Sequence, residues 1–161
     1  MDITIRPYRM DDLEAMLTIW NDVVEEGTEF PQMDLLNEQS GPQFFDAQTL
    51  TAVAERNGSI LGLYILHPNN VGRCGHICNA SFAVRRTARG MHLGEAMVRD
   101  CLEQAKGLGF RLLQFNAVVE NNVAAVKLYE KLGFTRIGKV PGGFLLKDGS
   151  FADIVLFYHK L

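Results

Sequence analysis

The residues best suited to chemistry surround a glycine-containing turn in the middle of the chain. The segment from Ile77 to Val84 is apolar and predicts a strand, and apolar residues from Leu93 onward recur at helical spacing. A turn with Gly90 and Gly94 joins the two elements. Unpaired N–H groups at a helix N-terminus favour an anion, and glycine lets phosphate oxygens approach the backbone. The turn therefore predicts a phosphate-binding loop, with nearby positive charge from Arg85, Arg86 and Arg89.

A second group of residues extends this pattern into a resemblance. A predicted strand at 111–119 leads through polar residues into a helix closed by Gly133. With these residues the chain resembles the GCN5-related N-acetyltransferase (GNAT) superfamily. The acetyl-CoA loop of that family, Arg/Gln-x-x-Gly-x-Gly/Ala, is matched by Arg89, His92 and Gly94. Its later signature, Asn-x-x-Ala-x-x-Leu-Tyr-x-x-x-Gly-Phe, is matched by Asn122, Ala125, Leu128, Tyr129, Gly133 and Phe134.

The resemblance implies acetyl-CoA as the donor and assigns residues to it. The backbone of Phe82, Ala83 and Val84 would hydrogen-bond the pantetheine amides as a missing strand would. The pyrophosphate would be held by the loop residues Arg89, Gly90, Met91, His92, Leu93, Gly94, Glu95 and Ala96. The remaining cofactor-binding residues would be Asn122, Ala125 and Tyr129, and Asn122 can also cap the following helix.

His92 departs from the family pattern because it stands where the loop usually has glycine. We expect His92 to adopt the right-handed helical conformation, from which its N–H would still point at a phosphate.

The same resemblance suggests direct acetyl transfer within a ternary complex. The chain has no Gly-x-Ser-x-Gly motif, and Cys101 lies within a predicted helix, so no covalent nucleophile is evident. Tyr129 matches the family's general acid toward the departing sulfur, and its alternative role is a half-buried aromatic of the core. The general base stays open, because the strand before the loop carries no carboxylate. The candidates are His76, Glu26 and Glu120, each with a surface or capping role as its alternative.

Two asparagines point to an acceptor site. Asn79 and Asn116 lie on predicted core strands, where asparagine needs hydrogen-bond partners. A substrate carboxylate or amide could supply them, as could a β-bulge or buried water. Together with Asn122 they resemble a branch that contains acetyltransferases of proline-analogue imino acids. The loops at 25–45 and 140–150 would frame the acceptor, with Glu26 and Phe30 as its contacts.

Composition bounds the remaining properties. The 161 residues, 47% of them hydrophobic, fit a single domain over 1–161. A net charge of −3 gives no basic surface for nucleic acid, and no apolar run reaches membrane-spanning length. We therefore expect a cytoplasmic protein without nucleic-acid or membrane partners, and a homodimer is the assembly we consider. Cys74, His76 and Cys78 could share one strand face, but they lack a fourth ligand, so strand packing is favoured over zinc.

The order of predicted elements indicates the fold. A strand at 2–7 and a helix ending near Gly27 precede a loop at 27–42 and a short helix around Phe44. Strands at 49–56 and 59–66 flank Asn57-Gly58, a strong hairpin signal. After the two motif helices, strands near 134–140 and 151–159 close the chain. This order predicts an α/β (α+β) fold like that of GNAT proteins: a mixed, mostly antiparallel twisted sheet of about seven strands, with about four helices on both faces.

These observations predict an acetyl-CoA-dependent N-acetyltransferase acting on a primary or secondary amine of a small, amino-acid-like acceptor. Two alternatives are an acyl-CoA-binding sensor without turnover and a protein N-terminal acetyltransferase.

Overall fold

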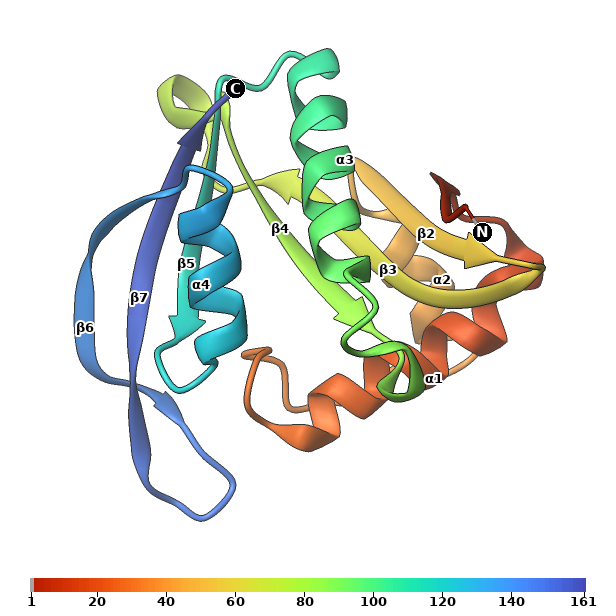
Figure 1. The fold of residues 1–161 in the computed structure, drawn as a ribbon, viewed down its shortest axis with the longest axis horizontal. Coiled ribbons are helices and arrows are strands. Elements are labelled where there is room, and N and C mark those ends of the chain that lie inside the picture. The colour runs from red at the N-terminus through yellow and green to blue at the C-terminus, as the bar shows by residue number, and fades with distance from the viewer. Residues whose placement is uncertain (1) are drawn as a thin grey trace.

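A computed structural model describes residues 2–161, which form one seven-stranded sheet covered by helices (Figure 1). Its strands run in the spatial order β1-β2-β3-β4-β5-β7-β6. They are β1 (Thr4–Pro7), β2 (Leu50–Arg56), β3 (Ser59–Pro68), β4 (Ile77–Val84), β5 (Leu112–Val119), β6 (Thr135–Leu145) and β7 (Phe151–Lys160). The α-helices are α1 (Leu13–Glu26), α2 (Ser40–Asp46), α3 (Leu93–Gly107) and α4 (Val123–Lys131). Short 3-10 helices lie at η1 (Met10–Asp12), η2 (Gly72–Cys74) and η3 (Arg86–Ala88). The predicted fold class is thereby confirmed.

Alternation along the central strands distributes the helices over both faces of the sheet. On β3, Tyr64 and Leu66 belong to the core beneath α3 and α4, whereas Leu63 and Ile65 belong to the core beneath α1 and α2. Successive strand residues point to opposite faces, so a run of apolar residues builds two cores at once. Every helix therefore buries its apolar side against the same sheet.

The local turn signals in the sequence are confirmed. Asn57 and Gly58 both have positive φ, at 52° and 78°, as the tight turn between β2 and β3 requires. Gly27 ends α1 in the left-handed conformation, with φ at 66°. None of the helices within residues 2–161 is long and apolar enough to cross a membrane.

The C-terminal hairpin is longer than predicted. We expected a strand to stop near Val140, but β6 continues to Leu145 through a bulge between Val140 and Phe144. The bulge absorbs the Pro-Gly-Gly segment, and the Gly142 N–H donates to Asp153 Oδ1 at 2.9 Å. A proline and two glycines thus mark an irregularity within a strand here, while the turn itself follows Leu145. The second helix also begins earlier than expected, at Ser40 inside the predicted loop.

The feature that creates room for a site is the divergence of β4 from β5. These parallel neighbours share only two residue pairs, Ile77 with Leu112 and Cys78 with Leu113. Beyond these pairs the strands separate, and Figure 1 shows the opening widening toward the carboxyl ends of both strands. On β5 a bulge between Phe115 and Val118 bends the strand in the same region.

Candidate active site

A cavity of about 570 Å³ occupies the opening between β4 and β5. Its walls come from β4, β5, the start of α3, α4 and the loop after α1. The predicted site residues that line it are Phe30, Asn79, Phe82, Val84, Arg89, Gly90, His92, Leu93, Gly94, Glu95, Asn116, Asn122, Ala125 and Tyr129. The chain therefore brings most of its two motifs to one concave surface.

The backbone of the phosphate-binding loop differs from our expectation at one position. His92 does not adopt the right-handed helical conformation: it is the N-cap of α3 with φ at 58° and ψ at 20°, in the left-handed region. Glycine takes this conformation freely, but a residue with a Cβ is strained by roughly 1–2 kcal/mol. Gly90, two residues earlier, also has a positive φ of 79°. His92 therefore preserves the path of a glycine loop at an energetic cost.

The start of α3 fits an anionic group. The backbone N–H groups at 90–95 donate to no backbone acceptor found within residues 2–161, and those in the first turn carry the positive end of the helix dipole. At Gly94 an added Cβ would meet only Leu128 Cδ2, at 3.8 Å, so the approach to the backbone is open. These donors suit the pyrophosphate of acetyl-CoA.

Charged side chains around the loop are mostly paired with one another. Arg89 donates to both carboxylate oxygens of Glu26, at 2.7 and 2.8 Å, and Arg86 donates to the same group at 2.9 Å. Glu95 accepts from Lys131 at 2.7 Å and from Arg99 at 2.9 Å, and these bonds lower its pKa. A phosphate at this loop would therefore bind mainly to the backbone N–H groups, because Glu26 already partly neutralises the charge of Arg86 and Arg89.

The edge of β4 fits the pantetheine arm of the same molecule. The N–H of Arg85 donates to Leu61 O on β3 at 2.7 Å. Backbone groups alternate in direction along a strand, so those of Ala83 face β3, whereas those of Phe82 and Val84 face the opening. Of the three backbone groups assigned to the cofactor, two are thus free to pair with it and Ala83 is not. On the opposite wall, Asn122 caps α4 by accepting from the Ala125 N–H at 3.3 Å.

Tyr129 lies half-buried in an aromatic cluster at the wall of the cavity. Its ring centroid is 4.4 Å from that of Phe115 and 5.4 Å from that of Phe134. Within the described part of the chain its hydroxyl has no hydrogen-bond partner. Burial, followed by the negative charge of Glu29, raises the pKa of Tyr129. The phenol is consequently protonated at neutral pH and available as a donor.

The three predicted general-base candidates all lie outside the cavity lining. Glu26 is held by two arginines, and although burial acts in the opposite direction, these bonds lower its pKa and make it a weak base. Glu120 forms an ion pair with Lys139 at 2.7 Å. The carbonyl of His76 accepts from the Arg111 N–H at 2.9 Å, at the closed end of the β4–β5 pair. Met91 and Ala96, from the loop, also lie outside the lining.

Glu29 is a cavity-lining carboxylate that the sequence interpretation did not select. It stands next to Phe30, which was predicted to contact the acceptor, and only three residues after Glu26. The adjacent Phe30 was the one signal that could have pointed to it, since no motif contains this position. Burial raises the pKa of Glu29; the charge of Arg89 opposes this shift, and the charge of Glu26 adds a smaller increase.

The two asparagines singled out from the sequence meet different partners. Asn79 Oδ1 accepts from the Ala80 N–H at 2.8 Å. Asn116 on β5 exchanges amide hydrogen bonds, at 2.6 and 3.4 Å, with Asn69 in the loop after β3. Gln114 also donates to Asn116 Oδ1, at 3.0 Å. Asn116 sits within the β5 bulge, so its unusual place in a strand has a local structural explanation.

The three cysteines differ in how far they are buried. Cys78 and Cys101 are fully buried, and Cys74 is exposed. Burial raises the pKa of Cys78 to about 12. Among residues 2–161 no group of three or more His, Cys, Asp or Glu side chains is placed to hold a metal ion.

Comparison with known proteins identifies the family. The model of the acetyltransferase (GNAT) family matches residues 13–134, so the chain belongs to that family. N-acetyltransferase aca1 of Schizosaccharomyces pombe is 34% identical over 111 residues, covering 68% of this chain and 53% of aca1. The chain thus spans about half the length of that relative. An L-methionine sulfoximine/L-methionine sulfone acetyltransferase of Pseudomonas paraeruginosa is 29% identical, covering 88% of this chain and 85% of that protein.

Solved structures agree with this assignment. A GCN5-related N-acetyltransferase from Kribbella flavida superposes with a TM-score of 0.90 and 33% identity, over 99% of this chain and 98% of that one. Proteins of the same fold have been solved with acetyl-CoA bound. The chain therefore shares the fold of the GNAT family to which it belongs.

Proposed function

We propose that this domain transfers the acetyl group of acetyl-CoA directly to the amine of a small, amino-acid-like acceptor. The observation that carries the proposal is the continuity of the cavity. Its lining includes the phosphate-binding loop at Gly94, the ring of Tyr129 and the polar residues Asn79 and Asn116. A donor held along β4 would place its thioester inside this cavity.

The size and chemistry of the cavity favour a small polar amine as the acceptor. A cavity of about 570 Å³ must hold part of the donor as well as the acceptor. Side-chain amides at Asn79 and Asn116 can bond either a carboxylate or an amide of the acceptor. The relative named for L-methionine sulfoximine and L-methionine sulfone adds support for amino-acid-like acceptors.

The two backbone segments and Tyr129 have distinct parts in this proposal. The N–H groups before and within the first turn of α3 hold the pyrophosphate, and the β4 backbone at Phe82 and Val84 aligns the pantetheine arm. Tyr129 gives its proton to the departing sulfur. Because no covalent intermediate on the protein is invoked, the cavity must hold donor and acceptor together, which confines the reaction to a ternary complex.

The test is thiol release from acetyl-CoA across a panel of amines. The panel contains L-methionine sulfone, L-methionine sulfoximine, phosphinothricin, L-proline analogues, a polyamine, an aminoglycoside and peptides with free N-termini. We expect turnover with the small amino-acid-like members. CoA binding without turnover on any amine would instead indicate an acyl-CoA sensor, and preference for peptides would indicate an N-terminal acetyltransferase. A cytoplasmic location and a homodimer stay predictions for cell fractionation and sedimentation to examine.

A further inference from the structure

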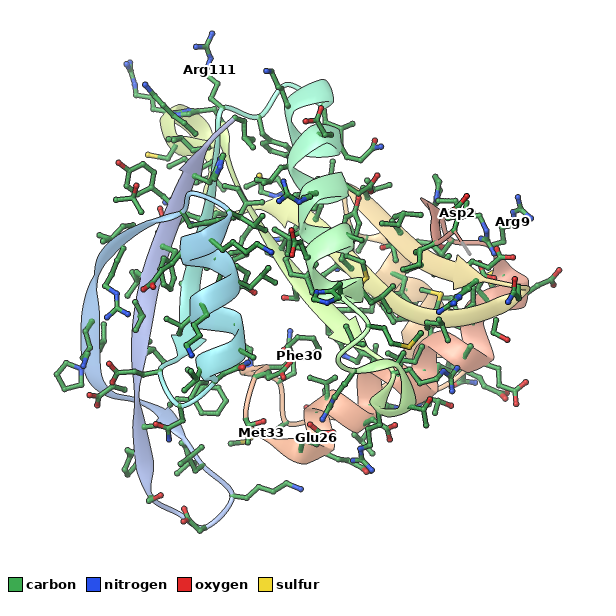
Figure 2. The ribbon with its side chains drawn as sticks, in the orientation of Figure 1. Asp2, Arg9, Glu26, Phe30, Met33 and Arg111 are labelled. Atoms are coloured by element: carbon green, nitrogen blue, oxygen red, sulfur yellow. The ribbon has the colours of Figure 1, made fainter. Side chains whose placement is uncertain are left out.

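Glu29 is held in the cavity wall by the residues on either side of it. The left-handed Gly27 turns the chain away from α1 two residues earlier. Phe30 then anchors the loop, because its ring is buried and lies 4.4 Å from that of Trp20, centroid to centroid. Figure 2 shows Glu26 and Phe30, which flank this segment, at the open end of the gap between β4 and β5. The loop is thereby fixed with the Glu29 side chain among the residues that line the cavity.

The other carboxylates near the donor site are already neutralised, and Glu29 is not. Glu26 is paired with two arginines, and Glu95 with a lysine and an arginine. Glu29 has neither an ion pair nor a hydrogen bond with any residue of the described chain. The charged and titratable groups that act on it are Glu26 from α1, Arg89 from the loop before α3, and Tyr129 from α4. A half-buried carboxylate without a partner is disfavoured as an anion, so its proton affinity is increased.

We propose that Glu29 is the general base that removes a proton from the ammonium form of the acceptor. This inference rests on the proposed N-acetyltransferase activity and names the group that the reaction still lacked. Glu29 and Tyr129 line the same cavity from different elements, the loop after α1 and α4. One is a carboxylate able to accept a proton and the other a phenol able to donate one. Two titratable groups with separated proton affinities in one cavity are suited to base and acid roles.

The proton and bond changes balance with these two residues alone. Glu29 takes one proton from the acceptor ammonium, leaving a neutral amine. The amine nitrogen bonds to the acetyl carbonyl carbon, and the carbon–sulfur bond breaks. The sulfur takes the Tyr129 proton, and the tyrosine oxygen regains a proton from the nitrogen that has just been acylated. Glu29 finally releases its proton to water, so an ammonium and a thioester yield an amide, a thiol and one proton.

The experiment measures kcat/KM against pH for Glu29→Gln, with the best acceptor of the panel. The substitution keeps the size and polarity of the side chain but removes its basicity. At neutral pH we expect a loss of about 10²-fold or more, the scale of a positioned base. The loss should shrink as pH rises toward the pKa of the amine, because the free amine then needs no base. Glu103→Gln removes a charge from an exposed position of α3 outside the cavity lining and should retain the wild-type profile.

Two results would overturn the inference. A loss that is the same at every pH would assign Glu29 to acceptor binding or structure, and wild-type activity in Glu29→Gln would remove it from the reaction. A separate measurement does not need turnover: carbon-13 NMR titration of the glutamate carboxyls, with Glu29 assigned as the signal missing from Glu29→Gln. We expect titration above the ordinary glutamate pKa of about 4.3, and a value at or below it would refute a base role. A wild-type protein inactive on every amine would refute the proposed function alone.

Discussion

Replacing Tyr129 with phenylalanine separates acid catalysis from packing, because the structure assigns the ring and the hydroxyl to different tasks. The ring packs against Phe115 and Phe134 with centroid separations of 4.4 and 5.4 Å. The hydroxyl, by contrast, bonds to no residue within 2–161 and borders the cavity. Phenylalanine preserves every ring contact and removes one oxygen.

The two effects have different expected sizes. Loss of a positioned acid should lower kcat by roughly 10²-fold, which corresponds to about 2.7 kcal/mol of activation free energy. The free energy of unfolding should change by less than about 0.5 kcal/mol, since no hydrogen bond is lost. Tyr129→Ala instead empties the centre of the aromatic cluster and should cost about 3 kcal/mol of stability.

The assay is steady-state thiol release at saturating acceptor, combined with urea unfolding of the same variants. Tyr129→Phe should be stable, should bind CoA with unchanged affinity and should turn over slowly. Because its pKa is raised, the Tyr129 hydroxyl stays protonated through the neutral range. The activity of the wild-type enzyme should therefore not fall in that range as pH rises. Wild-type kcat in Tyr129→Phe would refute the acid role and leave water as the proton source.

Variants at three further positions examine the phosphate-binding loop and the ion pair between Arg6 and Asp12. Gly94→Val should fold, because a Cβ there meets only Leu128 at 3.8 Å. In calorimetry it should weaken CoA binding by roughly tenfold or more. An affinity equal to that of the wild type would contradict the phosphate assignment. His92→Gly should raise the free energy of unfolding by about 0.5–1 kcal/mol through relief of the left-handed strain, whereas His92→Ala should not. Asp12→Asn should destabilise the protein by about 3 kcal/mol at neutral pH, because the bond from Arg6 lowers the Asp12 pKa. That stabilisation is present above the unfolded pKa of Asp12 and disappears as pH falls through the lowered folded pKa, so the unfolding free energies of wild type and Asp12→Asn should converge at acidic pH.

Features specified by local backbone chemistry could be predicted from the sequence. Asn57-Gly58 located a hairpin, and Gly27 located a helix end, because each demands a positive φ at a known offset. The strand, loop and helix around Gly94 were likewise evident from apolar spacing. Such signals involve only a few consecutive residues, so no tertiary information is needed to interpret them.

Features that depend on partners distant in sequence could not be predicted in this way. Glu26 was a reasonable base candidate until Arg86 and Arg89, some sixty positions away, were found to hold its carboxylate. Glu29 became a candidate base only because the fold places it in the same cavity as Tyr129. The conformation of His92 was missed for a related reason, since the surrounding loop imposes a backbone angle that histidine itself disfavours.

Because β4 and β5 share so few residue pairs, the sheet consists of two parts joined by a short ladder. Four strands, β1 to β4, lie on one side of the opening, and three, β5, β7 and β6, lie on the other. Only Ile77 and Cys78 connect the two parts through the β4–β5 ladder. Acetyl-CoA bonded to the free β4 edge and to the loop before α3 would also contact α4. It would therefore connect the two parts of the sheet. Saturation with donor should therefore slow amide exchange on both sides of the opening together. At a hundredfold excess over its dissociation constant, the donor should also stabilise the fold by about 2.7 kcal/mol.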